Sequence, residues 1–208
     1  MQAGGTGSIA RAATVRPIDM APYAVRWMTG PALAEGGWID PILALERENL
    51  GPLLEATGQA FPDVRRRAGL AAADATSVLL LRGGGLVGCI DFVPDWNDPE
   101  DLYVASVQLR APARGGPALG LLLAAGLEAA ERMAWHRLTA NVHPANHPAL
   151  RLAGRLGFRR TAAPGRSSVG LALPREALRA SPAATLAARL ALRHHLGLPS
   201  APESDEGG

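Results

Sequence analysis

The segment from Val107 to Gly120 combines a predicted strand, a glycine-containing loop and the start of a helix. It reads V-Q-L-R-A-P-A-R-G-G-P-A-L-G, and Gly115 and Gly116 allow its backbone to approach a ligand closely. The first N–H groups of a helix have no acceptor within the helix, and the helix dipole is positive at that end, so such a start attracts phosphate. Glycine before a helix is also a common structural device. Alone, the segment fits either a phosphate-binding loop or an ordinary turn.

A second segment, from Asn146 to Phe158, reads N-H-P-A-L-R-L-A-G-R-L-G-F. Asn146 is placed to cap the start of a short helix and Gly157 to end it. Capping accounts for each residue singly. It does not account for the presence of both segments in this order and at this spacing.

Together the two segments resemble motifs of the GCN5-related N-acetyltransferase (GNAT) superfamily. In that family a strand leads into a P-x-x-(Gln/Arg)-Gly-x-Gly-x-Gly/Ala loop that holds the pyrophosphate of coenzyme A (CoA), and an N-x-x-A-x-x-L-Y-x-x-x-G-F helix follows. The resemblance covers roughly residues 14–174. It implies an N-acetyltransferase that moves an acetyl group from acetyl-CoA to an amine of a small molecule or protein by direct transfer. The residues that it assigns to cofactor binding are Val107, Leu109, Arg114, Gly115, Gly116, Ala118, Leu119, Gly120, Asn146 and Leu152.

The chain departs from the family pattern at two places. Either Arg114 and Gly115 anchor the loop and a residue is inserted later, or Gly115 to Gly120 is the frame and the Gln/Arg is absent. Pro117 removes one backbone donor. Ala153 stands where many members have the tyrosine that reprotonates the leaving thiolate. These departures keep a second function open: a GNAT-fold module that binds acyl-CoA, or a partner, with little or no catalysis.

Direct transfer requires a polarised thioester carbonyl and a neutral amine, and the amine needs a base that acts directly or through water. The resemblance assigns the first role to backbone N–H groups around Val107–Leu109. We predict Asp91, Gln108 and Glu48 as bases or water-orienting groups. Asp91 is notable because it interrupts an apolar strand, where an unpaired charge is costly. Further polar residues with both a catalytic and a structural interpretation are Glu46, Asp95, Ser106 and His143. Tyr103 lies on a predicted strand, and nothing in the sequence shows that it replaces the tyrosine absent at Ala153.

Other chemistry-bearing residues have plainer explanations. Trp38 and Trp96 line an acceptor pocket or fill gaps in an aliphatic core, and we favour the core. Cys89, the one cysteine, is expected to be a buried small hydrophobe. His194 and His195 fit a helix C-terminus. Since no His/Asp/Glu cluster has metal-ligand spacing, we expect no metal.

The elements that must position these residues alternate between helical and strand patterns. Apolar spacing predicts helices over residues 41–56, 62–73, 117–135, 147–156 and 176–196, and strands over 14–18, 77–82, 86–93, 102–109, 137–142, 158–162 and 168–173. Gly83–Gly85 predicts a hairpin turn. The order β-α-α-β-β-β-α-β-α-β-β indicates a mixed α/β domain. The resemblance implies that this is an α/β GNAT fold: a mixed, mostly antiparallel six- to seven-stranded sheet flanked by helices.

Composition narrows the remaining possibilities. The chain has 208 residues, 48% hydrophobic, with a net charge of +2, which gives no reason to expect nucleic acid as a partner. All 21 Lys and Arg residues are arginine, so a Schiff-base lysine and a P-loop lysine are both excluded. We expect no membrane span, no signal peptide and a cytoplasmic location. We expect a flexible leader at 1–13, the GNAT domain at 14–174, a helical extension at 175–198 and a disordered tail at 199–208. The resemblance also allows a homodimer.

Overall fold

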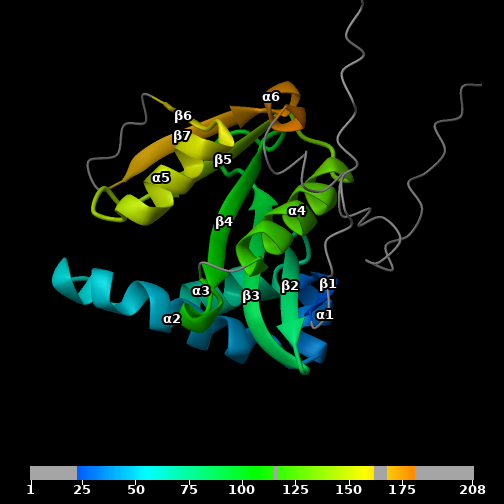
Figure 1. Cartoon of the computed structure of the whole chain (residues 1–208), viewed down its shortest axis with the longest axis vertical. Coiled ribbons are helices and arrows are strands. Elements are labelled where there is room, and N and C mark those ends of the chain that lie inside the picture. Colours follow the sequence, from blue (N-terminus) through cyan, green and yellow to red (C-terminus); the bar gives the residue numbers. More distant parts are fainter. Residues whose placement is uncertain (1–22, 115–116, 162–167, 181–208) are drawn as a thin grey trace, which may run out of the picture.

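The computed structural model describes residues 23–114, 117–161 and 168–180, which form one seven-stranded sheet with helices on both faces (Figure 1). The strands are β1 (Tyr23–Thr29), β2 (Thr76–Arg82), β3 (Gly85–Pro94), β4 (Leu102–Leu109), β5 (Arg137–Val142), β6 (Arg159–Arg160) and β7 (Val169–Pro174). The helices are α1 (Gly30–Glu35), α2 (Ile39–Ala56), α3 (Asp63–Ala71), α4 (Ala118–Glu131), α5 (His147–Leu156) and α6 (Arg175–Arg179), with a 3-10 turn η1 at Ala111–Ala113.

The strand order is β1-β2-β3-β4-β5-β7-β6. Every neighbouring pair is antiparallel except β4 and β5, which are parallel. The expected mixed, mostly antiparallel sheet flanked by helices is confirmed. The short helices α1 and α6 add to the expected order, and α6 falls at the start of the helix predicted from residue 176.

Two apolar cores lie on opposite faces of the sheet, because successive strand residues point to opposite sides. On one face α4 packs against the sheet, and buried residues of this core include Val78, Leu80, Ile90, Phe92, Leu121 and Leu122. On the other face α1, α2 and α3 pack, and buried residues there include Leu33, Ile42, Leu43, Leu79, Leu81 and Cys89. Figure 1 shows α4 and α5 in front of the sheet and α1, α2 and α3 behind it.

Local chemistry explains several element boundaries. Gly83 and Gly84 have φ of 57° and 80°, so the predicted hairpin closes through two left-handed residues that glycine adopts without strain. The helix predicted over 117–135 ends at Glu131 instead. The last turn closes through the N–H of Met133, which donates to the carbonyl of Ala130 at 3.0 Å, and the indole N–H of Trp135 donates to the same carbonyl at 2.6 Å.

Several other expectations differ from the structure or fall outside it. β1 and α1 were not predicted, and β6 is shorter than the expected strand over 158–162. The strand expected at 14–18, the leader, the tail and the histidine pair lie outside the described residues, as does the extension from residue 181 onward. In the described part of the chain, every helix is too short or too polar to cross a bilayer.

Candidate functional site

The sheet opens between β4 and β5. These two parallel strands pair only at Leu102–Leu138 and Tyr103–Thr139, after which each continues without pairing to the other (Figure 1). On its other side β4 carries a β-bulge: Asp91 faces Ser106 and Phe92 faces Val104, which leaves one extra residue in β4. A bulge bends its strand and increases the local twist. The opening therefore widens from Tyr103 toward the end of β4.

Backbone donors of β4 face this opening. The N–H of Arg110 donates to the carbonyl of Val87 in β3 at 2.8 Å. Because N–H groups of successive strand residues alternate sides, the N–H of Leu109 points away from β3, toward the side where β5 has diverged. By the same alternation Val107 presents its N–H to the opening. At both positions predicted to polarise the thioester carbonyl, the backbone N–H thus points into the opening.

Helix α4 begins shortly after β4, and the structure shows the start of its first turn. Leu121 donates to the carbonyl of Pro117 at 2.9 Å. The side chain of Ala118 is fully buried under the sheet, so only its backbone can meet a ligand. Leu119 and Gly120 are partly exposed, and Gly115 and Gly116 lie outside the described residues.

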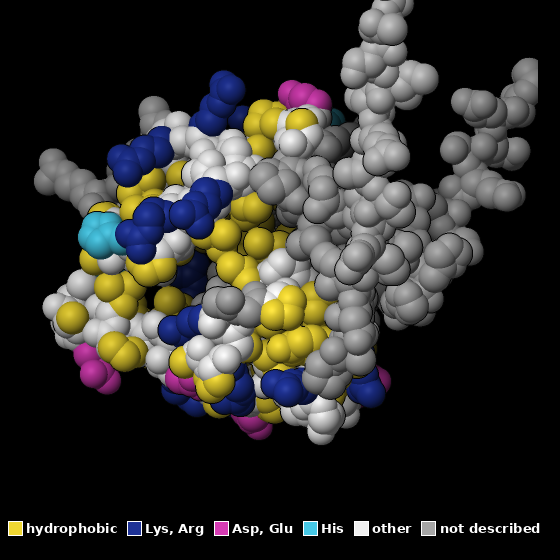
Figure 2. All heavy atoms as spheres, viewed as in Figure 1, with side chains coloured by type: hydrophobic (Ala, Val, Ile, Leu, Met, Phe, Trp, Pro, Cys, Tyr) yellow, Lys and Arg dark blue, Asp and Glu magenta, His cyan; other side chains and the backbone are white. Residues whose placement is uncertain are grey.

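Helix α5 has the ends that its sequence predicts. The side-chain oxygen of Asn146 accepts from the N–H of Ala149 at 3.2 Å, and Gly157 ends the helix at φ 93°. Leu152 is partly buried, and no residue of α5 is fully buried. Figure 2 shows a hollow beside α5, with basic side chains and a histidine gathered over the helix. Exposed basic residues of α5 are His147, Arg151 and Arg155.

Asn49, which the sequence analysis missed, joins α2 to the end of β4. Its side-chain amide donates to Oε1 of Gln108 at 2.8 Å and to the carbonyl of Leu109 at 3.2 Å. The guanidinium of Arg114 donates to the same carbonyl at 3.2 Å and also to Oδ1 of Asn49. Two predicted site residues, Gln108 and Arg114, are thus held by one asparagine. Asn49 follows three charged residues in the helix, so its sequence position did not distinguish it.

The three predicted catalytic side chains occupy different environments. Glu48 accepts from Arg110 at 3.1 Å, and its side chain is 40% exposed. Gln108 is buried beside Asn49. Asp91 lies on the same face of the sheet as Gln108, two positions away on the neighbouring strand. Asp91 and Gln108 thus lie on one face of the sheet, but each forms hydrogen bonds with different residues.

Asp91 belongs to a buried charged cluster that links α2, α3, β2 and β3. Its carboxylate accepts from Arg66 at 2.5 Å and from Ser77 at 2.5 Å, and Arg66 also donates to Glu46 at 2.7–2.9 Å. Burial raises the pKa of Asp91 to about 6, against the lowering effect of Arg66, while Glu46 raises it further. Burial likewise lifts the pKa of the Cys89 thiol well above its usual value, which fits the predicted inert hydrophobe.

The structure also shows the surroundings of the remaining residues that the sequence analysis named. His143 accepts from the N–H of Ala145 at 3.2 Å, as a turn residue does. Ser106 is buried on β4 beside the opening. The core assignment is wrong for Trp96, which is 62% exposed and packs its ring at a tilt of 59° against Tyr103, with ring centroids 4.8 Å apart. Trp38 packs against the core under α2 as expected. The described residues contain no group of metal-ligating side chains.

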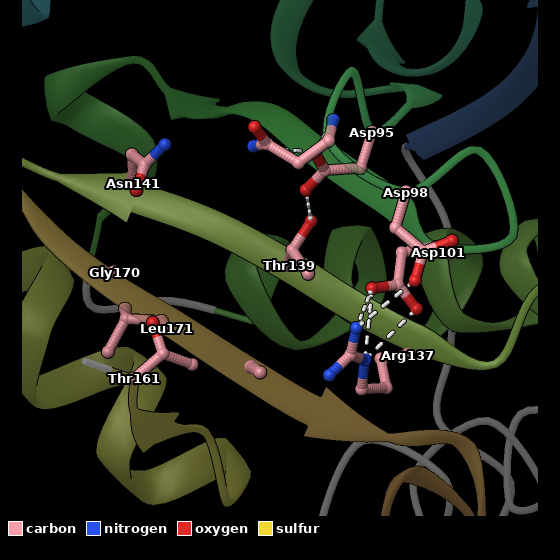
Figure 3. A pocket seen from close by; sticks show the side chains of 11 residues that line it. Asp95, Asp98, Asp101, Arg137, Thr139, Asn141, Thr161, Gly170 and Leu171 are labelled. Carbon is pink, nitrogen blue, oxygen red and sulfur yellow. Dashed lines mark hydrogen bonds and ion pairs between the residues drawn. The ribbon is translucent and has the colours of Figure 1, made fainter. Parts of the chain in front are cut away.

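A cavity of about 240 Å³ lies along β5, on the face opposite α4 (Figure 3). This face follows from strand alternation, because Leu138 and Leu173 belong to the core under α4 and their neighbours point the other way. Arg137 pairs with Asp101 at 2.6 Å, and Thr139 donates to Asp95 at 2.5 Å. The lining comes from the β3–β4 connection, β5 and β7: Asp95, Asn97, Asp98, Asp101, Arg137, Thr139, Asn141, Thr161, Gly170, Leu171 and Ala172.

Comparison with known proteins gives one family and a large group of similar folds. The family model described as "Acetyltransferase (GNAT) family" matches residues 42–158. No curated protein sequence matches the chain.

Three solved structures illustrate the shared fold. The PaiA N-acetyltransferase from Thermoplasma acidophilum in complex with coenzyme A is 10% identical with a TM-score of 0.56, over 73% of this chain and 98% of that one. An acyl-CoA N-acyltransferase from Pseudomonas aeruginosa is 16% identical (TM-score 0.58; 72% and 98%). The ribosomal-protein-S18-alanine N-acetyltransferase from Escherichia coli is 12% identical (TM-score 0.55; 73% and 93%). At these identities the likeness establishes the fold alone.

Proposed function

The chain belongs to the GNAT acetyltransferase family, and from that premise we propose that it transfers the acetyl group of acetyl-CoA directly to the amine of a small molecule or protein. The observation that carries this proposal is the opening of the sheet after Tyr103, with the N–H of Leu109 directed into it. Helix α4 starts a short loop further on. A strand donor and a helix start at one opening suit a ligand that carries both a carbonyl and phosphates.

The residues present fit CoA. The first turn of α4 offers backbone donors at Leu119 and Gly120, which are partly exposed, while Ala118 anchors the helix to the sheet. Basic side chains over α5 border the hollow in Figure 2 and add a positive potential that attracts phosphate. Leu152 contributes apolar surface on the same helix.

Acetyl-CoA supplies an acetyl thioester when it is bound. The N–H groups of Leu109 and Val107 then polarise the thioester carbonyl, and the amine nitrogen attacks its carbon. The C–N bond forms, the C–S bond breaks, the nitrogen loses one proton and the departing thiolate gains one. These donors require no rearrangement, because β3 fixes the backbone of β4.

We assign proton transfer to side chains on the face of the sheet that α2 covers. We assign proton acceptance, through water, to Glu48, since its carboxylate reaches solvent at the end of β4. Gln108, fixed by Asn49, orients that water or the amine. Asp91 is committed to Arg66 and Ser77, so we assign it to positioning.

The thiolate takes its proton from water. Ala153 has no acidic group. Tyr103 lies four residues before Val107, roughly 13 Å along the strand. Thiolates leave readily near neutral pH, and general acid assistance contributes typically about 10²–10⁴-fold. We therefore expect a slower reaction rather than none.

Calorimetric titration with acetyl-CoA and with CoA tests cofactor binding. We expect a Kd near the micromolar range, about −8 kcal/mol. Gly120→Glu places a carboxylate beside the phosphates while suiting the helix dipole, and should weaken binding at least tenfold (about 1.4 kcal/mol). Gly120→Gln is the matched neutral control. No binding up to millimolar CoA would refute the proposal.

Release of free CoA thiol in the presence of amines tests transfer. Glu48→Gln should lower kcat by roughly 10²–10⁴-fold, whereas Glu55→Gln on the same helix should leave kcat unchanged. Tight CoA binding without turnover across a broad amine panel would instead support an acyl-CoA-binding module, which the absence of a tyrosine at Ala153 also favours.

A further inference from the structure

The net charge of +2 conceals an uneven distribution of charge along the chain. Between Glu131 and Glu176 the sequence contains eight arginines and three histidines but no aspartate or glutamate. This stretch forms β5, α5, β6 and β7. Protein surfaces ordinarily intersperse charges of both signs, whereas a surface of one sign attracts partners of the opposite sign. This part of the molecule is therefore suited to an anionic partner.

Some of these arginines are already paired, and others are not. Three pair with acids from outside the stretch, and one lies outside the described residues: Arg132 with Glu128, Arg137 with Asp101 and Arg175 with Glu131 are the pairs, and Arg166 is the remaining one. Arg151, Arg155, Arg159 and Arg160 are exposed, and none of these four forms an ion pair with another described residue. They are the charges that a partner can reach.

Helix α5 carries a line of positive charge away from the opening. Because α4 follows β4, α5 follows β5 and the two strands are parallel, both helices begin at the same end of the opening. His147, Arg151 and Arg155 recur every four residues, so they lie on one side of α5, roughly 6 Å apart along its axis. Figure 2 shows these basic side chains gathered over α5, beside the hollow.

Strand β6, the edge of the sheet, extends this surface by one arginine. Arg160 pairs with Leu171 of β7, two residues from Leu173, which belongs to the core under α4. Since side chains alternate along a strand, Arg160 lies on the face that α4 and α5 cover, and Arg159 lies on the other face. We call His147, Arg151, Arg155 and Arg160 the basic face.

The basic face is more extensive than a single nucleotide requires. One guanidinium or two suffice to hold a phosphate group through bidentate hydrogen bonds. Arg151 and Arg155 are a helical turn apart, and Arg160 lies on a different element. Separate positive charges on a helix and on the neighbouring edge strand instead match several carboxylates on the surface of a folded protein. Arginine suits such contacts because its planar fork binds carboxylates bidentately.

The location of the basic face indicates what such a protein delivers. The basic face borders the opening from α5, next to the start of α4, where we place the phosphates of the acyl donor. The side chains that we assign to the amine lie on the opposite face of the sheet, which α2 covers. A protein bound to the basic face is therefore on the donor side of the reaction.

The start of α4 also favours a donor with few phosphates. Pro117 stands at the N-cap of α4 and has no N–H, so the chain offers one backbone donor fewer where a phosphate would bind. CoA carries a pyrophosphate and a further phosphate, whereas a phosphopantetheine arm attached to a protein carries a single phosphodiester. This observation is independent of the basic face and points to the same kind of donor.

We propose that the basic face binds an acidic carrier protein, which presents the acyl group as a thioester on a phosphopantetheine arm, and that the chain uses this donor as well as acetyl-CoA. The inference rests on the proposed function. The arm of the carrier and that of CoA are identical up to the first phosphate, so the opening receives both. The amine nitrogen attacks the thioester carbon, the C–N bond forms and the C–S bond to the carrier breaks. The nitrogen loses one proton, and the phosphopantetheine thiolate gains one.

Titration of the protein with an acetylated bacterial acyl carrier protein tests binding. We expect a Kd that rises at least about tenfold from roughly 50 to 200 mM salt, because exposed charges make the contact. Arg160→Glu should raise the Kd at least about tenfold, and Arg160→Gln should raise it less. Arg159→Glu is the matched control, since it makes the same change on the other face, and should raise the Kd less than about threefold.

Affinity for CoA serves as the control for folding. Strand β6 lies outside the residues that we assign to CoA, so Arg160→Glu and Arg159→Glu should both leave the Kd for CoA unchanged. Release of the carrier's free thiol, with an amine that acetyl-CoA acetylates, then tests transfer. Arg160→Glu should raise KM for the acetylated carrier at least about tenfold, with kcat and the KM for acetyl-CoA unchanged.

The outcomes separate the two proposals. Absence of saturable carrier binding, or equal weakening by Arg160→Glu and Arg159→Glu, would overturn the carrier inference and leave transfer from acetyl-CoA standing. Carrier binding that depends on Arg160, without transfer from either donor, would overturn the proposed function and leave the binding surface standing. Arg160-dependent binding of a short RNA or of anionic lipid vesicles that is tighter than carrier binding would overturn the choice of partner.

Discussion

Asp91→Asn tests the physical account of the buried charged cluster through the pH dependence of folding. Burial raises the pKa of Asp91 from 3.8 to about 6 in the folded protein. Between these two values the folded state binds more protons than the unfolded state, so the free energy of unfolding falls as the pH rises. The stability that protonated Asp91 provides is complete below pH 4 and lost above pH 6. Asparagine does not titrate and abolishes this contribution.

The two pKa values fix the magnitude. Linkage between a folded pKa of about 6 and an unfolded pKa of 3.8 gives a change of about 2 kcal/mol from pH 4.5 to pH 7. The attraction of Arg66 acts only on ionised Asp91, so it is already contained in the pKa of about 6, and the remaining effect of the substitution is an offset that does not vary with pH. The difference in unfolding free energy between wild type and Asp91→Asn should therefore shift by about 2 kcal/mol, in favour of the variant at pH 7.

Urea unfolding followed by tryptophan fluorescence, at half-unit steps from pH 4.5 to 7, measures this difference. Titration of groups that do not interact with Asp91 cancels when the two proteins are compared at each pH. Asp74→Asn, an exposed acid before β2, serves as the control and should give a constant difference. Parallel curves for wild type and Asp91→Asn would refute the account, because they would mean that Asp91 keeps an ordinary pKa.

Three further substitutions test other parts of the structure. Arg66→Met leaves two buried carboxylates without a cation and should cost about 3–5 kcal/mol of unfolding free energy in urea, whereas the exposed Arg65→Met should cost under about 0.5 kcal/mol. Asn49→Ala removes hydrogen bonds worth about 0.5–1.5 kcal/mol each and frees the end of β4, so calorimetry should show weaker CoA binding; unchanged affinity would contradict its positioning role. Gly157→Ala forces a side chain into left-handed backbone, φ 93°, and should cost about 1–2 kcal/mol in thermal unfolding.

Elements whose boundaries depend on neighbouring residues were predictable from the sequence. Helix α5 is bounded by a cap at Asn146 and a left-handed glycine at Gly157, both visible in the sequence. The β2–β3 hairpin turns on adjacent glycines. By contrast, α4 ends before the residue that its apolar spacing predicts, and the indole of Trp135 donates back to Ala130, a contact that periodicity does not reveal. Strand β1 was missed because its register is set by pairing with β2, far along the chain.

In the candidate site, too, features that depend on neighbouring residues were predictable from the sequence, and features that depend on distant contacts were not. The glycine loop and the capped helix are short motifs, so their residue types could be found directly. The contact between Asn49 and Gln108 joins residues 59 positions apart, and that between Asp95 and Thr139 joins residues 44 apart. A single sequence contains no sign that such residues meet. The environment of Asp91 also depends on a distant partner, Arg66, which the sequence showed only as part of a basic run.

The short junction between β4 and β5 has a consequence for how the molecule opens. Within the sheet only two residue pairs join an antiparallel unit, β1 to β4, to a second antiparallel unit, β5 to β7, although both units contribute side chains to the core under α4. Helix α5 adds no fully buried side chain to that second unit. Amide protons of β5, α5 and β7 should therefore exchange with solvent together, at lower free energy than those of β2 and β3. A ligand that lies across the opening would bridge the two units and slow this exchange. Hydrogen exchange of the second unit thus reports occupancy of the opening.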